Sequence, residues 1–352
     1  MIPNSCLRLL VPSEPKNCSR PLPAGASIVY VGQIFVDALT RFAEQSRNPR
    51  LAPIIRRAGA PVRVAVHGRS GVGRTTVSAA LSNAGLAVAA GEAEADVAVL
   101  VIAETLKPED RVAGLPTMIV LNKADLTGFG ADGPLARAQR HAAAIHASTN
   151  TPTVPVVGLL AIAELDDELI AALRTLVDEP ADLTSTDAFV ESAHPLPARV
   201  RRRLLDTLDR FGIAHAVLAV EDGADVASLG ALLRRISGIG EVVAQVEALA
   251  APVRYRRVRA AIAELNALAT RSADQELAAF VVADETVLAV MGAAVDVVEA
   301  DGVRVDRGDD PGAHRRRAVH WRRYGDGPVA ALHRSCSADI CRGSLRLLGR
   351  CR

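Results

Sequence analysis

The chain lacks an excess of either charge. Its 352 residues include 41 Lys and Arg against 40 Asp and Glu, which gives a net charge of +1. A protein whose main partner is a nucleic acid or an anionic membrane surface usually has a strong basic balance. The composition therefore disfavours nucleic acid as a partner, and any basic effect has to be local.

The chain also lacks cysteine clusters and long apolar runs. Its five cysteines form no Cys-x-x-Cys pair and have no histidines at the spacing of a zinc site, which predicts reduced thiols in a cytoplasmic protein. The first thirty residues contain no apolar core of signal-peptide length. The longest apolar stretch, residues 277–298, is interrupted by Asp284, Glu285 and Asp296, so we expect no transmembrane segment.

Apolar residues are abundant and follow regular patterns. They make up 49% of the chain, which is enough for a sizeable core. Changes of pattern divide the chain into four parts. These are an N-terminal arm with a leading helix (1–60), an α/β domain (61–178), a helix-strand-helix and helical region (179–300), and a loop with a basic C-terminal tail (301–352).

Within residues 61–178, short runs rich in Val and Ile alternate with stretches of helical periodicity. This alternation predicts an α/β fold, a mostly parallel sheet with helices on both faces, followed by a largely helical C-terminal region. The predicted strands cover residues 62–66, 96–103, 116–122 and 153–160, and the predicted helices begin at Thr75 or cover residues 107–114, 133–149 and 165–177.

A polar linker that begins at Glu179 marks the next change of pattern. The residues beyond it favour helices, with one short apolar run that favours a strand. The expected elements are a helix over 196–212, a strand over 213–221, a helix over 225–238 that ends at Gly238, further helices up to Val298, and an exposed loop over 301–317.

A glycine-rich turn follows the first predicted strand. The sequence GRSGVGRT has the spacing G-x-x-x-x-G-K-[ST], except that arginine replaces the lysine. In such a loop, glycines let successive backbone N–H groups point at phosphate oxygens in front of a helix N-terminus, and the Thr75 hydroxyl would hold Mg²⁺. The alternative is a tight strand-to-helix turn without a ligand. The candidate phosphate-binding residues are Gly68, Ser70, Gly71, Val72, Gly73, Arg74, Thr75 and Thr76.

Arg74 is the one departure from that spacing. Lysine offers a compact point charge to the outer phosphates, whereas a guanidinium is a wider planar fork. The positive charge is therefore kept, but its fit beneath the loop changes.

A second motif, Asn122-Lys123-Ala124-Asp125, ends the strand predicted over residues 116–122. It resembles the guanine-recognition motif of the P-loop GTPases, and it follows the phosphate loop in the order of that family. The resemblance covers residues 61–178. It implies that these residues form a P-loop domain that binds GTP or GDP. It implies that Asp125 accepts two hydrogen bonds from guanine, that Asn122 braces the loop, and that the Lys123 stem packs along the base. Adenine would leave such a carboxylate unpaired, so guanine is the favoured base.

The same resemblance implies a base contact in the loop after the strand predicted over residues 153–160. The family has a Ser-Ala element there, whereas this chain has Gly158 and Leu159. Any contact from this loop therefore comes from the backbone.

The interval between the phosphate loop and Asn122 is shorter than is usual in the GTPases and contains no Asp-x-x-Gly. In the family, that element senses the terminal phosphate and Mg²⁺, and water attack needs a positioned nucleophile, a metal and charge stabilisation. We hypothesise that Glu104, which follows a predicted strand at the carboxyl edge of the sheet, holds a Mg²⁺-bound water in its place. The alternative is a solvated residue that only ends the strand. The expected activity is that of a slow or hydrolysis-deficient GTPase.

Three functions are open at this point. The first is a guanine-nucleotide-binding regulatory switch or assembly factor, a GTP hydrolase if it is active, with a protein partner bound through the C-terminal region. The second is a degenerate P-loop protein that acts as a scaffold or adaptor without nucleotide turnover. The third is an ATP-binding protein in which N-K-A-D is accidental. The basic segment 314–324 could contact an anionic partner or fold onto the acidic loop before it.

Overall fold

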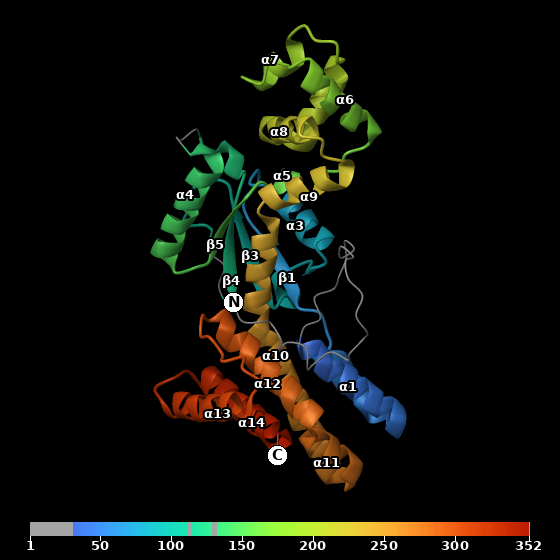
Figure 1. The fold of residues 1–352 in the computed structure, drawn as a ribbon, viewed down its shortest axis with the longest axis vertical. Coiled ribbons are helices and arrows are strands. Elements are labelled where there is room, and N and C mark those ends of the chain that lie inside the picture. The colour runs from blue at the N-terminus through green and yellow to red at the C-terminus, as the bar shows by residue number, and fades with distance from the viewer. Residues whose placement is uncertain (1–30, 111–113, 129–131, 352) are drawn as a thin grey trace. The chain divides into compact units, whose positions relative to one another are not determined.

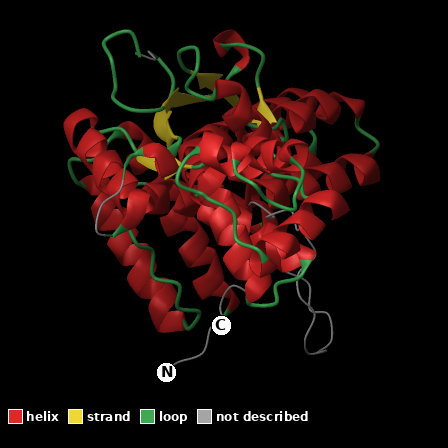
Figure 2. Cartoon of the chain, turned by 90° about the horizontal axis from the view of Figure 1, so that it is seen from above, coloured by secondary structure: helices red, strands yellow, loops and turns green. Residues whose placement is uncertain are grey.

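The structure is a computed structural model in which helices outnumber strands (Figure 2). A parallel sheet with helices is present, as the predicted α/β class requires. The arm predicted at residues 1–24 lies outside the described part of the chain. The structure describes residues 31–110, 114–128 and 132–351.

Contacts divide the chain into two compact units. The α/β unit is Val62–Leu249, and the helical unit is Met1–Pro61 together with Ala250–Arg352. The boundary between them falls within helix α10 (Ile239–Ser272). The helical unit therefore joins segments that are far apart in the sequence.

A five-stranded sheet lies at the centre of the α/β unit (Figure 1). All neighbouring strands pair in parallel, in the order β2-β1-β3-β4-β5, so their carboxyl ends share one edge of the sheet. The strands are β1 (Arg63–His67), β2 (Ala87–Val88), β3 (Val97–Ile102), β4 (Thr117–Asn122) and β5 (Thr153–Val156).

Helices cover both faces of this sheet. β3 is buried along its whole length, as expected for a central parallel strand with two covered faces. On one face, alternate side chains of β3 and β4 pack with α3 (Arg74–Asn83) and the first turns of α10. On the other face they pack with α4 (Gly133–Thr149). The first set is Val99, Val101, Met118 and Val120, and the second is Leu100, Ile102, Ile119 and Leu121.

After β5 the chain forms a group of helices with its own apolar cluster. Two of these helices begin at aspartates that cap them, because Asp166 accepts from the N–H of Leu169 (3.0 Å) and Asp225 from the N–H of Ser228 (2.7 Å). The helices are α5 (Gly158–Ala161), α6 (Asp167–Asp178), α7 (Thr186–Glu191), α8 (Ala198–Glu221) and α9 (Val226–Ile236).

Two predicted elements of this unit are wrong, and the strand predicted over residues 153–160 ends at Val156, because α5 begins at Gly158. Residues 213–221, expected as a strand, form the second half of α8, where Ile213 and Ala216 are buried one helical turn apart. A short apolar run cannot be assigned by periodicity alone, and alanine and leucine favour helix at this site. The helix expected over residues 107–114 is wrong for the part that is described, where residues 108–109 form a turn.

The helical unit has a core that draws on most of its helices. Phe35 of the first helix, Tyr255 of α10 and Trp321 near the C-terminus are each at most 1% exposed and belong to one cluster. The predicted leading helix and helical C-terminal region are both present. The helices are α1 (Val31–Ser46), α2 (Ala52–Ala58), α11 (Gln275–Val282), α12 (Asp284–Ala300), α13 (Pro311–Asp326) and α14 (Ala331–Arg350).

The loop predicted over residues 301–317 is wrong beyond residue 310, where α13 begins. Pro311 occupies the first turn of that helix, a position that suits proline because no N–H is needed there. Asp310 caps the same turn by accepting from the N–H of Ala313 at 2.9 Å. The many charged residues of this stretch concealed a capped helix start.

Helix length and composition bear on the expected absence of a transmembrane segment. Among the described residues, no single helix combines the length and apolar character that a bilayer crossing needs. Two bent pairs, α9 with α10 and α11 with α12, would do so by length and composition alone. The cytoplasmic location stays a prediction.

Helix α8 is interrupted at Asp209. Its φ of 54° and ψ of 175° lie in a region that glycine occupies almost exclusively. The Asp209 carboxylate accepts from the N–H of Arg210 (2.6 Å), and the Arg210 guanidinium donates to the carbonyl of Thr184 (2.6 Å). Beyond the kink, a Cβ on Gly212 would lie 2.5 Å from Cδ2 of Leu160. These contacts hold a strained residue close to α5.

If the backbone at Asp209 is strained, Asp209→Gly should raise the free energy of unfolding by about 1 kcal/mol, even though a hydrogen bond is lost. Asp206→Gly, three residues earlier on an exposed and regular part of α8, should lower it by about 0.5–1 kcal/mol. Urea denaturation of both variants measures the two changes. If Asp209→Gly and Asp206→Gly destabilise the protein equally, the backbone at Asp209 is not strained.

Candidate functional site

The phosphate loop predicted at residues 68–75 connects β1 to α3. Three of its glycines have positive φ angles: +148° at Gly68, +83° at Gly71 and +87° at Gly73. A Cβ on Gly68 would lie 2.6 Å from the carbonyl oxygen of Val101 on the neighbouring strand. Glycine is therefore required here by backbone angles and by close approach to β3.

The N-terminus of α3 is open at the end of this loop. Gly73 is its N-cap in a left-handed conformation, no side chain caps the helix, and the first turn contains no acidic residue. Arg74 and Thr75 are exposed, and Thr76 is half-buried. The first N–H groups of a helix lack partners within it, so this end suits an anion.

Asn122 joins the phosphate loop to the loop that follows β5. Its side-chain amide donates to the carbonyl of Val72 (2.9 Å), and its amide oxygen accepts from the N–H of Gly158 (2.9 Å). Asn122 is only 3% exposed. A Cβ on Gly73 would overlap this amide, and one on Gly158 would lie 2.8 Å from its oxygen. The structure thus brings together three segments that the sequence singled out separately.

The residues predicted to contact the base come directly after Asn122 in the chain. Lys123 has a left-handed backbone (φ 57°), which turns the chain into a short 3-10 helix, Ala124–Leu126. Ala124 is fully buried in the cluster that also contains Leu160 and Leu208. Lys123 remains exposed and Asp125 half-buried.

The pKa of Asp125 is raised, mainly because burial removes the carboxylate from water. The negative charge of Asp209 raises this pKa further, while the backbone N–H of Asp125 itself and the charge of Lys123 lower it. Asp209, at the kink of α8, is thus the carboxylate whose charge contributes to this shift.

Gly158 and Leu159 are the two residues after β5 whose backbone was expected to contact the base. The backbone N–H of Gly158 already has a hydrogen-bond partner within the protein. Its N–H donates to Asn122, as described above, and Gly158 is buried. Leu159 follows it in the first turn of α5 and is half-buried.

An ion pair that the sequence analysis missed fixes the phosphate loop from the other side. Asp110, which is 6% exposed, accepts from Nε of Arg69 (2.9 Å) and from the N–H of Lys107 (2.9 Å). Arg69 lies in the loop itself, and Asp110 lies in the connection between β3 and β4. No periodicity signals such a pairing, because it depends on how two loops meet.

A second missed pair lies beside β1. β2 runs parallel to β1, and the chain then leads through Gly91 to Glu92, whose Oε1 lies 3.4 Å from Nε2 of His67. This Nε2 is buried and makes no hydrogen bond of acceptable geometry. A carboxylate thus lies next to His67, the residue before the phosphate loop, although it is not part of an Asp-x-x-Gly.

The two residues expected to hold Mg²⁺, both described in the structure, are not joined by a hydrogen bond. Thr75 is in the first turn of α3, and Glu104 is exposed two residues beyond β3. Both follow strands at the same edge of the sheet. No group of three His, Cys, Asp or Glu side chains within the described ranges is arranged to hold a metal. Mg²⁺ binding through Thr75 and Glu104 stays a prediction.

Comparison of the chain with protein-family models, curated proteins and solved structures gave no match.

Two glycines of the loop differ in the space around them and so form a matched pair. Gly71→Ala meets no atom within 4 Å and should cost about 1–2 kcal/mol of stability for its positive φ alone. Gly73→Ala carries the same strain and also displaces Asn122, so it should cost a further ~1–3 kcal/mol. Urea denaturation measures both. Equal losses would mean that Asn122 does not hold the loop.

Proposed function

We propose that the α/β unit is a guanine-nucleotide-binding module. The observation that carries this proposal is the double hydrogen bond of Asn122, which joins the phosphate loop, the N-K-A-D segment and the loop after β5. A nucleotide needs a phosphate cradle and a base pocket held at a fixed distance. One buried amide supplies that constraint.

In this proposal the open N-terminus of α3 and the loop glycines receive the phosphates of GTP or GDP. Thr75 and Glu104 would hold the accompanying Mg²⁺, which supplies charge neutralisation to the phosphates. Asp125 would accept from the N1–H and 2-amino groups of guanine, and the stem of Lys123 would pack along the base. Adenine offers an acceptor where guanine offers N1–H, so it would leave Asp125 unpaired.

The same residues favour slow hydrolysis or none. Arg69 is already paired with Asp110, so it is not free to stabilise charge on a terminal phosphate. Arg74 keeps a charge near the phosphates but with a wider group than lysine. The protein would then act as a regulatory switch or assembly factor, with the helical unit as the surface for a protein partner. A scaffold without bound nucleotide is the second candidate, supported by the lack of an Asp-x-x-Gly between the phosphate loop and Asn122.

Asp209 enters this proposal as a second carboxylate of the base pocket. Its charge acts on Asp125, and a strained backbone holds it in place. Guanine has two hydrogens on its 2-amino group, and Asp125 would use one of them together with N1–H. We infer that Asp209 takes up the other, which would favour guanine over hypoxanthine, the base that lacks this amino group.

Calorimetric titration with GTP, GDP and ATP tests the base assignment. We expect micromolar binding of the guanine nucleotides and none of ATP, and Asp125→Ala should weaken GDP binding by about tenfold or more. Asp125→Asn should shift the preference toward xanthosine diphosphate, because the side-chain amide can donate to the 2-oxo group that replaces the amino group.

Asp132→Asn, an exposed acid of the same unit, is the charge-matched control and should change nothing. Binding of no nucleotide would support the scaffold, and a preference for ATP would show that N-K-A-D is accidental.

Asp209→Asn tests the second carboxylate through selectivity. The ratio of GDP to inosine diphosphate affinity should fall by about three- to tenfold, because a charged acceptor for the 2-amino group is lost. Guanine binding needs the ionised carboxylate of Asp125. The affinity for GDP should therefore fall as the pH drops through the raised pKa of Asp125. Removing the Asp209 charge should move that fall to lower pH.

The exposed Asp206→Asn on the same helix is the control. An unchanged selectivity ratio in Asp209→Asn, with GDP still bound and still dependent on Asp125, would reject the role of Asp209 and leave the nucleotide site standing.

A further inference from the structure

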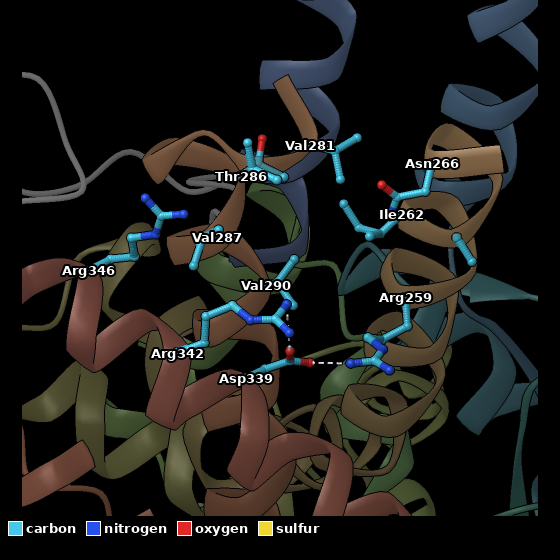
Figure 3. Close-up of a pocket in the computed structure, with 12 residues that line it drawn as sticks. Arg259, Ile262, Asn266, Val281, Thr286, Val287, Val290, Asp339, Arg342 and Arg346 are labelled. Atoms are coloured by element: carbon cyan, nitrogen blue, oxygen red, sulfur yellow. Dashed lines mark hydrogen bonds and ion pairs between the residues drawn. The ribbon is translucent and has the colours of Figure 1, made fainter. Parts of the chain in front are cut away.

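A cavity of about 450 Å³ lies within the helical unit and includes none of the candidate nucleotide-site residues. Helices α10, α11, α12 and α14 all contribute to its lining (Figure 3). A volume of this size falls in the range of small-molecule sites. One wall is apolar and consists of Ile262, Val281, Val282, Val287 and Val290.

The opposite wall is organised by a buried carboxylate. Asp339 is 2% exposed, and its Oδ2 accepts from the hydroxyl of Tyr255 (2.8 Å) and from Nη1 of Arg259 (2.9 Å). Burial raises the pKa of Tyr255, so its hydroxyl stays a donor. Nη1 of Arg342 lies 3.7 Å from the other oxygen of Asp339. Figure 3 shows Asp339 between the guanidinium groups of Arg259 and Arg342.

Positive charge exceeds negative charge around this wall. Arg346 lies 3.5 Å from Asp284, but the second oxygen of Asp284 accepts a shorter bond, of 2.8 Å, from Arg350. The three arginines of the lining and Arg350 therefore face two carboxylates, Asp339 and Asp284, which leaves an excess of two positive charges. The side chains of Arg342 and Arg346 are 64% and 47% exposed, so a ligand can reach them.

We propose that this cavity binds an amphipathic anion. A carboxylate or phosphate head contacts Arg342 and Arg346, which lie one turn apart on α14, in the bidentate geometry that guanidinium groups offer to oxyanions. An apolar chain then lies along the valine-rich wall formed by α11 and α12. At about 30 Å³ per water-sized group, the cavity holds a chain of roughly eight to ten carbons and its head. Asp339 does not repel the head, because the guanidinium of Arg259 balances its negative charge.

Calorimetry on the full chain with octanoate, octyl phosphate, octyl glucoside and inorganic phosphate tests this assignment. We expect both octyl anions to bind, and to bind at least tenfold more tightly than the neutral glucoside or the bare phosphate. Shortening the chain from eight to six carbons should weaken binding by about fifteenfold, since each buried CH₂ contributes roughly a fourfold factor. Equal binding of octyl phosphate and inorganic phosphate, or of octanoate and octyl glucoside, would overturn the proposal.

Variants separate the head from the chain. Arg342→Gln with Arg346→Gln should weaken octanoate about tenfold or more, whereas Arg323→Gln, an exposed arginine of α13 outside the lining, should not. Ala263→Phe adds a ring at an exposed position of the lining and should abolish binding of the chain without unfolding the protein.

A bilayer is the other source of such anions. If vesicles containing phosphatidic acid bind through Arg342 and Arg346 while no free octyl anion binds, the arginines form a membrane-docking patch and the cavity assignment is wrong.

Discussion

The candidate site depends on the two hydrogen bonds of one buried side chain. Asn122 donates to the carbonyl of Val72 and accepts from the N–H of Gly158, which uses both ends of its amide. An aspartate could not donate and a leucine could do neither, so a buried backbone group would be left unpaired, which costs about 1–3 kcal/mol. The absence of a Cβ at Gly73 and Gly158 makes room for this amide. Three loops are therefore placed relative to one another before any ligand is considered.

A continuous series of contacts extends from this amide to helix α8. Gly158 begins α5, whose Leu160 packs against Gly212 just beyond the kink. The strain at Asp209 persists because the residues that follow it are fixed, Arg210 by its bond to Thr184 and Gly212 by this close packing. A rearrangement at the phosphate loop would reach α8 through packed atoms rather than through solvent.

The sequence predicted what depends on local pattern and missed what depends on how loops meet. Alternating apolar runs predicted four of the five strands of the parallel sheet, because each of these runs is short and rich in Val or Ile and precedes residues of helical periodicity. The glycine spacing predicted a tight loop, and positive φ angles are present there. The same reasoning failed at residues 213–221, since a short apolar run fits a buried helix equally well. The pairs Arg69 with Asp110 and Arg259 with Asp339 lie 41 and 80 residues apart, and no periodicity relates such positions.

Those two pairs also show how buried carboxylates distribute positive charge in this chain. A buried carboxylate is stable only when it is paired, so each one fixes an arginine. In the phosphate loop, Asp110 engages Arg69 and leaves Arg74, for which the described residues provide no ion pair, to face an anion with the helix N-terminus. In the helical unit, Asp339 engages Arg259 fully and Arg342 only loosely, so charge remains for a ligand. Within the proposed function, an arginine without an acidic partner among the described residues suits binding of a polyanion more than stabilisation of a transition state in which further charge develops.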